Sequence, residues 1–486
     1  MTAGTIRPRW LLCVAAVAFV AAVLGIGVPA TPGEPVAVDE PQYLLTALSL
    51  IEDGDLDIAD ELAERRWRDL TPVEPPQETV AQPDGSRVSP HDPLLPLLLA
   101  VPVGLGGRVG AKLAMAGLAA ALAALTLWVA VRRYRIPVPL ATAGVAAAAA
   151  SAPLAVYGQQ VYPELPAALA CLLGVAALTG PPRRGALVVL AVAVTALPWL
   201  SIKYAPVAAA LAVLAVLRWW CTGRPPPPGN THPHRRSRAP GTTTRMRVAG
   251  GRREVGWFAG VLAAMAAGYA LVHVAVWGGL TVYAGGDHFQ ETGQLGVMGE
   301  DPSFLFRSWR LIDLLVDRTF GLVAWQPAWL LLVPALGALV VHRLPGGRAA
   351  LLLPLAAGWL VATYPALTMH GYWWPGRQVV VVLPLALLVI LCWLARAGRA
   401  PLVLAAVLAA AGVFTYGCLL VDGHTGEVAW VNHFQDADAP VFHLLHPVLA
   451  HYGTSTSNVI WVVLTAALLT AGYVAARRGQ VGAPAG

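Results

Sequence analysis

The chain has 486 residues, of which 57% are hydrophobic and 12% are charged, with a mean hydropathy of +0.62 and a net charge of +6. Soluble domains carry about 25% charged residues, so this composition excludes a water-exposed globular protein and indicates a helical domain that lipid largely covers. The positive net charge does not indicate a nucleic-acid-binding protein, because the basic residues lie in short clusters between apolar segments. The five cysteines have no CxxC spacing and support neither a disulfide framework nor a zinc site.

Apolar segments of roughly 20 residues recur along the chain, and a helix of that length crosses the hydrocarbon core of a bilayer. The first segment, residues 10–29, follows two arginines and is predicted to be a retained anchor, with a cleavable signal peptide as the alternative. The sequence predicts an all-α polytopic membrane protein with about twelve transmembrane helices, forming one domain over residues 1–486. The other predicted spans are residues 109–131, 137–157, 160–180, 184–199, 203–220, 255–281, 319–342, 349–369, 377–395, 400–421 and 458–476.

Residues 93–105 are also apolar, but this segment is short for a span and suits an interfacial or re-entrant helix better. With that segment on the outer surface, the positive-inside rule places both termini in the cytoplasm and the basic clusters on the inner face. If the segment crosses the membrane, nearly all of these clusters move to the outside. The clusters are Arg132-Arg133-Tyr134-Arg135, Arg183-Arg184, residues 218–254, Arg343 with Arg348, Arg396 with Arg399, and Arg477-Arg478.

Two long polar segments carry opposite charge. Residues 30–92 hold fifteen acids and four arginines, and residues 30–108 are predicted to form the first extracytoplasmic loop with surface helices. Residues 218–254 hold nine arginines and one acid, and they are rich in proline, glycine and threonine. The part from 221 to 254 is therefore predicted to be a disordered cytoplasmic loop that lies against anionic lipid headgroups.

A pair of acids, Asp39 and Glu40, opens a short predicted helix in the first loop. Pro41 suits the first turn of a helix, and Asp39 is well placed to cap it, so the residue has two interpretations, as a helix cap and as a catalytic acid or base. The two roles do not exclude each other. The helix is predicted to be amphipathic and to lie on the membrane surface, from the spacing of Tyr43, Leu44, Ala47, Leu48 and Ile51.

Further polar residues are predicted to lie at the outer face, where spans begin or end. Lys203 stands between two spans with almost no loop, so it must either snorkel outward or meet an anion. Trp374 precedes Arg377 at the mouth of another span, and an interfacial aromatic belt is the alternative to a binding role. The remaining candidates are His91, Tyr162, Glu164 and Tyr204, together with the loop residues Asp287, His288, Glu291 and Glu300.

A run of acids after the predicted first-loop helix hints at calcium. Asp53, Asp55 and Asp57 alternate around Gly54 and Leu56, but the remaining positions of an EF-hand loop are absent. The stronger pattern is an acid close to cations at the outer face. A carboxylate that accepts a hydroxyl proton, beside cations that hold a departing phosphate, suits glycosyl transfer from a lipid-phosphate donor.

At these residues the sequence resembles the GT-C superfamily of membrane glycosyltransferases, which includes protein O-mannosyltransferases and lipid A aminoarabinose transferases. The likeness extends over about residues 10–390, and the acidic pair in its context is its most specific part. In the segment that resembles the family's His-Pro-Pro-Leu, Asp92 replaces the first proline. The motifs are Asp39-Glu40-Pro41-Gln42-Tyr43, Asp53-Gly54-Asp55-Leu56, Ser89-Pro90-His91-Asp92-Pro93-Leu94-Leu95-Pro96, Gln160-Val161-Tyr162-Pro163-Glu164, Lys203-Tyr204, Asp317-Arg318-Thr319-Phe320-Gly321 and Trp374-Pro375-Gly376-Arg377.

The resemblance implies a polyprenyl-phosphate-sugar donor and an inverting reaction, with Asp39 as general base. Glu40 would be its neighbour in contact with the acceptor or a metal, and Lys203 and Arg377 would bind phosphate. No metal ligands are assigned, although a divalent metal remains open. The acceptor would be a glycan, lipid or protein at the outer face of the cell membrane. Two alternatives remain: a transporter or flippase of a lipid-linked sugar, and a non-catalytic assembly factor of the envelope.

Overall fold

The apolar runs form helices, because a backbone in lipid must satisfy its hydrogen bonds within its own segment. The computed structural model describes residues 6–75, 78–79, 81–222, 251–285, 303–366 and 368–481. In these ranges the regular structure is helical, apart from three isolated β-bridges. The first half contains α1 (Pro8–Leu24), α2 (Glu40–Glu52), α3 (Ala59–Ala63), η1 (Arg66–Asp69), α4 (Leu94–Arg132), α5 (Val138–Ala149), α6 (Leu154–Tyr157), α7 (Glu164–Thr179), α8 (Arg184–Leu200), η2 (Ile202–Tyr204) and α9 (Ala205–Thr222).

The second half follows the same pattern, with short 3₁₀ helices, labelled η, between longer α-helices. The predicted loop over 221–254 lies mostly outside the described residues, and its two ends are helical, in α9 and α10. The elements are α10 (Gly251–Trp277), η3 (Val282–Gly285), α12 (Phe304–Arg307), α13 (Arg310–Val316), α14 (Leu322–Trp325), η4 (Pro327–Leu331), α15 (Leu332–Val341), α16 (Ala349–Thr363), η5 (Arg377–Val382), α17 (Leu383–Leu394), α18 (Arg399–Thr425), η6 (Phe434–Asp436), α19 (Pro440–Leu445) and α20 (Ser455–Val481).

Six helices within the described ranges are long and apolar enough to cross a membrane, namely Leu94–Arg132, Ile202–Cys221, Gly251–Gly285, Arg377–Leu394, Arg399–Thr425 and Ser455–Gly479. Six shorter apolar helices of 10–17 residues fall in other predicted spans: Pro8–Leu24, Val138–Ala149, Glu164–Thr179, Arg184–Leu200, Pro327–Val341 and Ala349–Thr363. The chain is thus a helical membrane protein. The count of twelve spans and the side of the membrane on which each loop lies stay predictions.

Two predicted spans are not continuous helices. In residues 319–342 the helix α14 ends at Trp325, and Gln326 takes an extended conformation before Pro327 begins η4. In residues 137–157 the helix α5 ends at Ala149, and α6 begins after Pro153. Proline lacks an N–H and disfavours the helical conformation of the residue before it, which explains both interruptions.

The short segment 93–105 is a distinct part of α4. Gly106 and Gly107 leave the helical conformation, the second with a φ of +54°, and they separate this segment from the longer helix that follows. A Cβ atom at Gly110 would collide with the carbonyl oxygen of Pro102, so the bend also requires a glycine on its far side. Leu97 and Leu105 are exposed, as expected where an apolar helix meets lipid or headgroups. Its predicted position on the outer surface stays a prediction.

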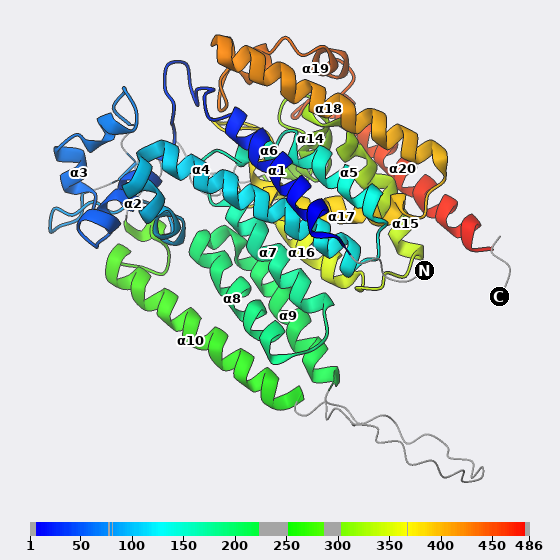
Figure 1. Cartoon of the computed structure of the whole chain (residues 1–486), viewed down its shortest axis with the longest axis horizontal. Coiled ribbons are helices and arrows are strands. Elements are labelled where there is room, and N and C mark those ends of the chain that lie inside the picture. The colour runs from blue at the N-terminus through cyan, green and yellow to red at the C-terminus, as the bar shows by residue number, and fades with distance from the viewer. Residues whose placement is uncertain are drawn as a thin grey trace, which may run out of the picture.

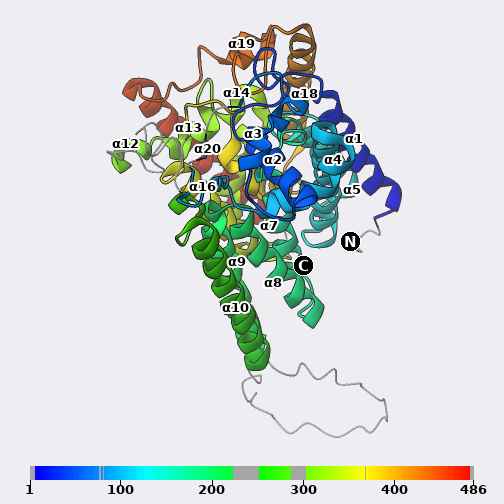
Figure 2. The same cartoon turned by 90° about the vertical axis from the view of Figure 1, so that its left-hand side faces the viewer.

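The first loop packs against α4 and against one end of the helices α7 to α10. The helix α2 packs against α4, which also contacts α1 and α7, while α7, α8, α9 and α10 lie side by side (Figures 1 and 2). The C-terminal end of α10 reaches the first loop, because the Trp277 indole donates to the Ser89 carbonyl and Gln82 donates to the Val276 carbonyl. The first loop also meets the segment before α7 and the segment η5, because Glu40 accepts from the Val161 N–H and Asp39 from Arg377.

Several loops with predicted inner basic clusters also share one end of the molecule. Arg218 donates to the carbonyl of Gly180, which lies against the Arg133 guanidinium. Gly346 packs against Tyr134 and Thr179. The C-terminal end of α9 and the connections after α4, α7 and α15 therefore lie together.

Candidate active site

Asp39 directly precedes α2, and Pro41 lies in the first turn of that helix, as the sequence predicts. Its carboxylate forms no capping hydrogen bond within the described part of the chain, and Oδ2 lies 2.5 Å from Nη2 of Arg377. Burial opposes ionisation, but the charge of Arg377, with smaller contributions from His91 and Lys203, outweighs it and lowers the pKa of the Asp39 carboxyl. The structure contradicts the capping interpretation, because the side chain is turned to a cation from another part of the chain.

Glu164, the first residue of α7, receives both predicted phosphate-binding cations. Its Oε1 accepts a hydrogen bond from Nζ of Lys203 at 2.7 Å and from Nε of Arg377 at 3.0 Å. Of the two alternatives for Lys203, the structure shows the second, with Glu164 as the anion. The cations lie on η2 and η5, so three segments far apart in the sequence converge on one carboxylate.

Two tyrosines complete the wall of this cluster. The guanidinium carbon of Arg377 lies 4.2 Å from the centre of the Tyr162 ring, and Nζ of Lys203 lies 5.2 Å from the centre of the Tyr204 ring. Both tyrosine hydroxyls are buried, and, like Oε2 of Glu164, they form no hydrogen bond with a described residue. Buried polar atoms normally have a partner, so these three leave hydrogen-bonding capacity unused in the wall of the cluster.

Exposure shows the side from which this cluster is reached. The side chains of Arg377 and Glu164 are 8% and 0% exposed, so they form the inner wall. The side chains of Asp39, Lys203 and His91 are 17%, 21% and 18% exposed, and they mark the opening. A ligand entering here meets Asp39 and Lys203 before it meets Arg377.

His91 lies at the opening and contacts Glu78, an acid that the sequence did not single out. Its Nε2 lies 3.3 Å from Oε2 of Glu78, and its ring stacks on Tyr43 at a centroid distance of 4.5 Å. Burial disfavours the imidazolium, but the bond to Glu78 and the charges of Asp39 and Glu78 raise the pKa of His91. One ligand atom each of Asp39, Glu78 and His91 lies within 4.8 Å of the others, a set of oxygen and nitrogen ligands that can hold a divalent cation.

Glu40, the predicted partner of Asp39 in catalysis, lies away from this opening. Its carboxylate is fully buried, accepts a hydrogen bond from the Val161 N–H at 2.9 Å, and lies 4.0 Å from Nζ of Lys112. Burial raises the pKa of Glu40, although Lys112 and the backbone donors oppose that shift. Lys112 in turn donates to the Pro35 carbonyl at 2.9 Å. Glu40 therefore joins the first loop to α4 and α7, and its burial argues against direct contact with a substrate.

Trp374 was predicted to bind substrate, with an interfacial belt as the alternative. Its complete burial contradicts the belt, and the binding role stays a prediction. The side chain is 0% exposed and packs against Trp325 and Phe434 at centroid distances of 5.0 and 5.2 Å. Its carbonyl accepts a hydrogen bond from the Tyr157 hydroxyl at 2.6 Å. A large apolar ring gains most from complete burial, so Trp374 holds the segment before Arg377 in the core.

Sequence reasoning missed a buried polar group on α10. Asp92 accepts hydrogen bonds from the Tyr269 hydroxyl at 2.9 Å and from the Ile202 N–H at 3.0 Å, and Nε2 of His273 lies 3.0 Å away. Asp92 thereby fixes the residue before Lys203 and ties α10 to the site. Tyr269 and His273 stand one helical turn apart in an otherwise apolar span, and that spacing is the signal that could have found them.

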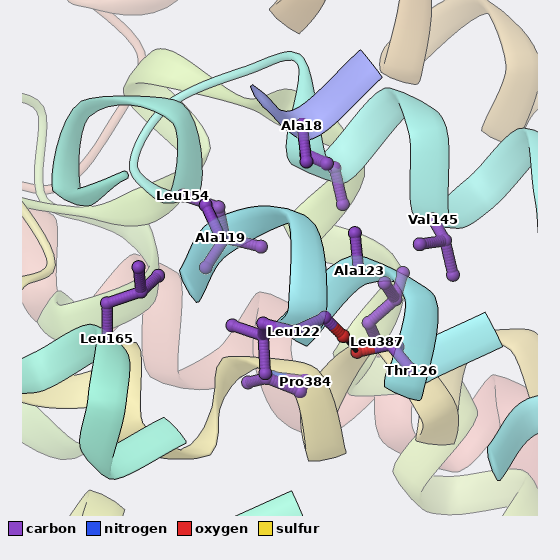
Figure 3. Close-up of a pocket in the computed structure, with 12 residues that line it drawn as sticks. Ala18, Ala119, Leu122, Ala123, Thr126, Val145, Leu154, Leu165, Pro384 and Leu387 are labelled. Atoms are coloured by element: carbon purple, nitrogen blue, oxygen red, sulfur yellow. Dashed lines mark hydrogen bonds between the residues drawn. The ribbon is translucent and has the colours of Figure 1, made fainter. Parts of the chain in front are cut away.

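Two cavities in the helical region lie apart from this cluster. One of about 20 Å³ is lined by apolar side chains and Thr126 where α1, α4, α5, α6, α7 and α17 meet (Figure 3), and it has room for little more than one water molecule. Another of about 580 Å³ lies between α5, η4, α17 and α18, and Gln326 is the polar side chain in its lining. Neither lining contains a charged residue of the site.

The candidates Asp287, His288, Glu291 and Glu300 lie outside the described residues. The structure accordingly places seven of the nine predicted site residues around the charged cluster or its opening, and puts Glu40 and Trp374 in buried surroundings.

Comparisons with known proteins add little to this geometry. No protein-family model matches the chain, and no curated protein matches its sequence. Among solved structures it is similar to a crystal structure of ArnT from Cupriavidus metallidurans bound to undecaprenyl phosphate, with a TM-score of 0.49 and 15% sequence identity, over 96% of this chain and 78% of that chain. A likeness at this level does not carry an argument about function, so the assignment below rests on the chain's own residues.

Proposed function

We propose that this protein is a membrane glycosyltransferase that moves a sugar from a polyprenyl-phosphate donor to an acceptor hydroxyl on the extracytoplasmic face. The observation that carries the proposal is the bond between Asp39 and Arg377, which joins a first-loop carboxylate to a cation 338 positions away. A residue that only capped α2 would not need this partner. The GT-C resemblance includes motifs around both residues, and it supports the same chemistry.

The charges around Asp39 are balanced without a ligand. Two carboxylates, Asp39 and Glu164, face two cations, Lys203 and Arg377. A phosphate that enters at the partly exposed Lys203 brings a further negative charge, and it competes with the carboxylates for the donors of both cations. Charge-assisted hydrogen bonds of this kind stabilise a phosphate oxygen strongly and also stabilise the charge that develops on a departing phosphate.

This competition would also activate the base. Arg377 holds the pKa of Asp39 low, and a carboxylate with a low pKa is a weak base. When the donor phosphate takes the guanidinium donors, Asp39 loses its partner and becomes a better proton acceptor. The acceptor oxygen attacks the anomeric carbon and loses its proton to Asp39, while the bond from that carbon to the phosphate oxygen breaks. The polyprenyl phosphate leaves with the bonding electron pair, held by Lys203 and Arg377.

A transporter of a lipid-linked sugar is the alternative, since Lys112 is an ionisable residue inside α4, and transporters place such residues within the membrane. The contacts of Lys112 favour the enzyme. Its ammonium group bonds to the Pro35 carbonyl and faces Glu40, both in the first loop, so it lies at the end of the span that meets this loop.

Asp39→Asn tests the proposal in membranes supplied with a panel of radiolabelled polyprenyl-phosphate sugars and envelope acceptors. The amide can still accept a hydrogen bond from Arg377 but cannot take the proton, so sugar transfer should fall by about 10²–10⁴-fold. The unfolding temperature should stay close to that of the parent. Asp69→Asn, at a carboxylate that is 78% exposed, is the matched control. Parental turnover in Asp39→Asn would remove the main support for the enzyme, and transbilayer movement of the lipid-linked sugar without transfer would indicate the transporter.

A further inference from the structure

The acids that follow α2 do not converge as their sequence order indicates. Oδ1 of Asp55 accepts hydrogen bonds from the Ser49 hydroxyl at 2.9 Å and the Asp57 N–H at 3.0 Å. Oδ1 of Asp57 accepts from the Ala59 and Arg87 N–H groups at 3.0 and 2.7 Å. These two acids shape the loop, and of the alternating run only Asp53 belongs to the group of acids that comes together nearby.

A different set of acids is brought together instead. Asp53, at the C-terminal end of α2, meets Asp60 and Glu61 from the first turn of α3, and one carboxylate oxygen from each lies within 4.8 Å of the others. Gly54, with a φ of +81°, provides the turn that brings the two helices together. Three like charges this close repel one another unless a cation or a proton lies between them.

The second observation is the state of Glu61. Its side chain is 2% exposed, and no hydroxyl, amide or basic group of a described residue donates to either carboxylate oxygen. Its neighbour is the Asp60 carboxyl, and burial together with that contact raises the pKa of Glu61 to about 8. A buried carboxylate that lacks a donor is costly, and this one lies in the group formed with Asp53 and Asp60. In the described ranges none of the three forms an ion pair with a basic side chain, and Arg66, the nearby arginine, is occupied by Glu52 at 2.7 Å.

We infer that Asp53, Asp60 and Glu61 bind a divalent cation, and that its chemical class is calcium. Calcium takes carboxylate oxygens at about 2.3–2.6 Å, so two ligands on opposite sides of the ion lie up to about 5 Å apart, which matches the observed spacing. Magnesium is smaller and gives up its water shell reluctantly, so a buried carboxylate such as Glu61 suits it poorly. The exposed Asp53 and Asp60 leave room for water to complete the coordination.

The ion would hold the end of α2 against α3. The loop between them is already tied to the segment before His91, because the Ile58 N–H donates to the Arg87 carbonyl at 2.8 Å. A cation at this place would therefore stabilise the fold of the first loop. It would take no part in the proposed reaction at Asp39.

The test is calcium binding by the full-length protein in nanodiscs after removal of divalent ions, measured by equilibrium dialysis with ⁴⁵Ca²⁺ up to about 5 mM. The parent should bind an ion at this site with a Kd of about 10⁻⁴–10⁻³ M, as in extracellular modules, and its unfolding temperature should rise with calcium. In Glu61→Gln, and in the exposed variant Asp53→Asn, that affinity should fall by about tenfold or more, and the thermal shift should disappear. Glu64→Gln, at an exposed acid just after α3, is the matched control and should behave as the parent.

Three results would overturn the inference. The first is a parent without calcium binding or thermal shift, which would leave Glu61 as a protonated carboxyl beside Asp60. The second is a Glu61→Gln variant that binds calcium as the parent does. The third is loss of the ion in Glu78→Gln but not in Glu61→Gln, which would place the ion at the group formed by Asp39, Glu78 and His91. Sugar transfer is not part of the readout, so failure here does not bear on the proposed function.

Discussion

Two adjacent acids of the first loop, Asp39 and Glu40, meet very different surroundings. The Asp39 carboxylate stands at an opening, 17% exposed, and bonds to a cation that also serves Glu164. Glu40 is sealed, with backbone donors and Lys112 around it. Successive residues at the start of a helix point about 100° apart, so one turns toward the opening and the next toward the core. The comparison shows that a charged pair at an opening can exchange partners with a ligand, whereas a sealed pair can only hold segments together.

The largest effect is expected at Arg377, which serves both acids at the opening. Arg377→Ala leaves Asp39 and Glu164 without a shared cation in a largely buried place, and removing one partner of a buried pair costs about 3–5 kcal/mol of stability. Binding of polyprenyl phosphate should be lost as well. Thermal unfolding and lipid binding measure the two effects.

Arg377→Lys sharpens the same test. It keeps the charge, but an ammonium group cannot present the two separate donors that reach Asp39 and Glu164. Stability should lie between that of the parent and Arg377→Ala, while transfer stays low. If Arg377→Ala unfolds at the same temperature as the parent, Arg377 does not bond to Asp39 and Glu164 in the membrane.

The sealed pair should show the opposite pattern. Glu40→Gln leaves Lys112 buried without a countercharge, so stability should fall, while the rate of transfer per folded molecule stays close to that of the parent. Adding Lys112→Met to Glu40→Gln removes the unpaired charge and should restore part of the loss. The double-mutant cycle should give a coupling energy of about 0.5–3 kcal/mol.

Two outcomes would contradict the distinction between the acids. One is additive behaviour of Glu40→Gln and Lys112→Met in the unfolding measurements, which would mean that the two side chains do not interact. The other is a loss of transfer in Glu40→Gln that exceeds its loss of folded protein, which would return Glu40 to the reaction.

The sequence was sufficient to predict most of the helices and to single out the residues of the charged cluster, because both depend on local patterns. Apolar runs mark the helices, and Lys203 and Arg377 stand out as cations at the ends of such runs. The interruptions before Pro153 and Pro327 were also predictable in principle, since a proline disturbs the residue that precedes it.

The pairing of charges could not be predicted in the same way. That Glu164 is shared by Lys203 and Arg377 depends on contacts across 39 and 213 positions, and no local pattern contains this information. The burial of Trp374 has the same origin, because a tryptophan at the end of a span looks alike in a core and in an interfacial belt. Asp39 was open to two interpretations for a related reason, since its backbone position is that of a cap while its side chain serves another segment.

The smallest effect is expected at Asp313, which extends the comparison to a buried acid that forms no ion pair with a basic residue in the described ranges. Its carboxylate is 1% exposed and accepts a hydrogen bond from Asn458 at 3.1 Å. Burial, together with the charge of Asp317, raises the pKa of Asp313 to about 7 from an ordinary value of 3.8. Between these two values the folded chain holds a proton that the unfolded chain has released, so the free energy of unfolding should fall as the pH rises from about 4 to about 7 and then level off.

Asp313→Asn places a permanently neutral group of the same shape in this position, so it should remove this part of the pH dependence. The variant and the parent should unfold at similar temperatures near pH 4, and the variant should be the more stable of the two at pH 8. Thermal unfolding across this range measures the difference, with Asp436→Asn, at a side chain that is 64% exposed, as the control. If the difference in unfolding temperature between the parent and Asp313→Asn does not change with pH, Asp313 is ionised throughout this range. It would then need a cation, as Asp39 and Glu40 do.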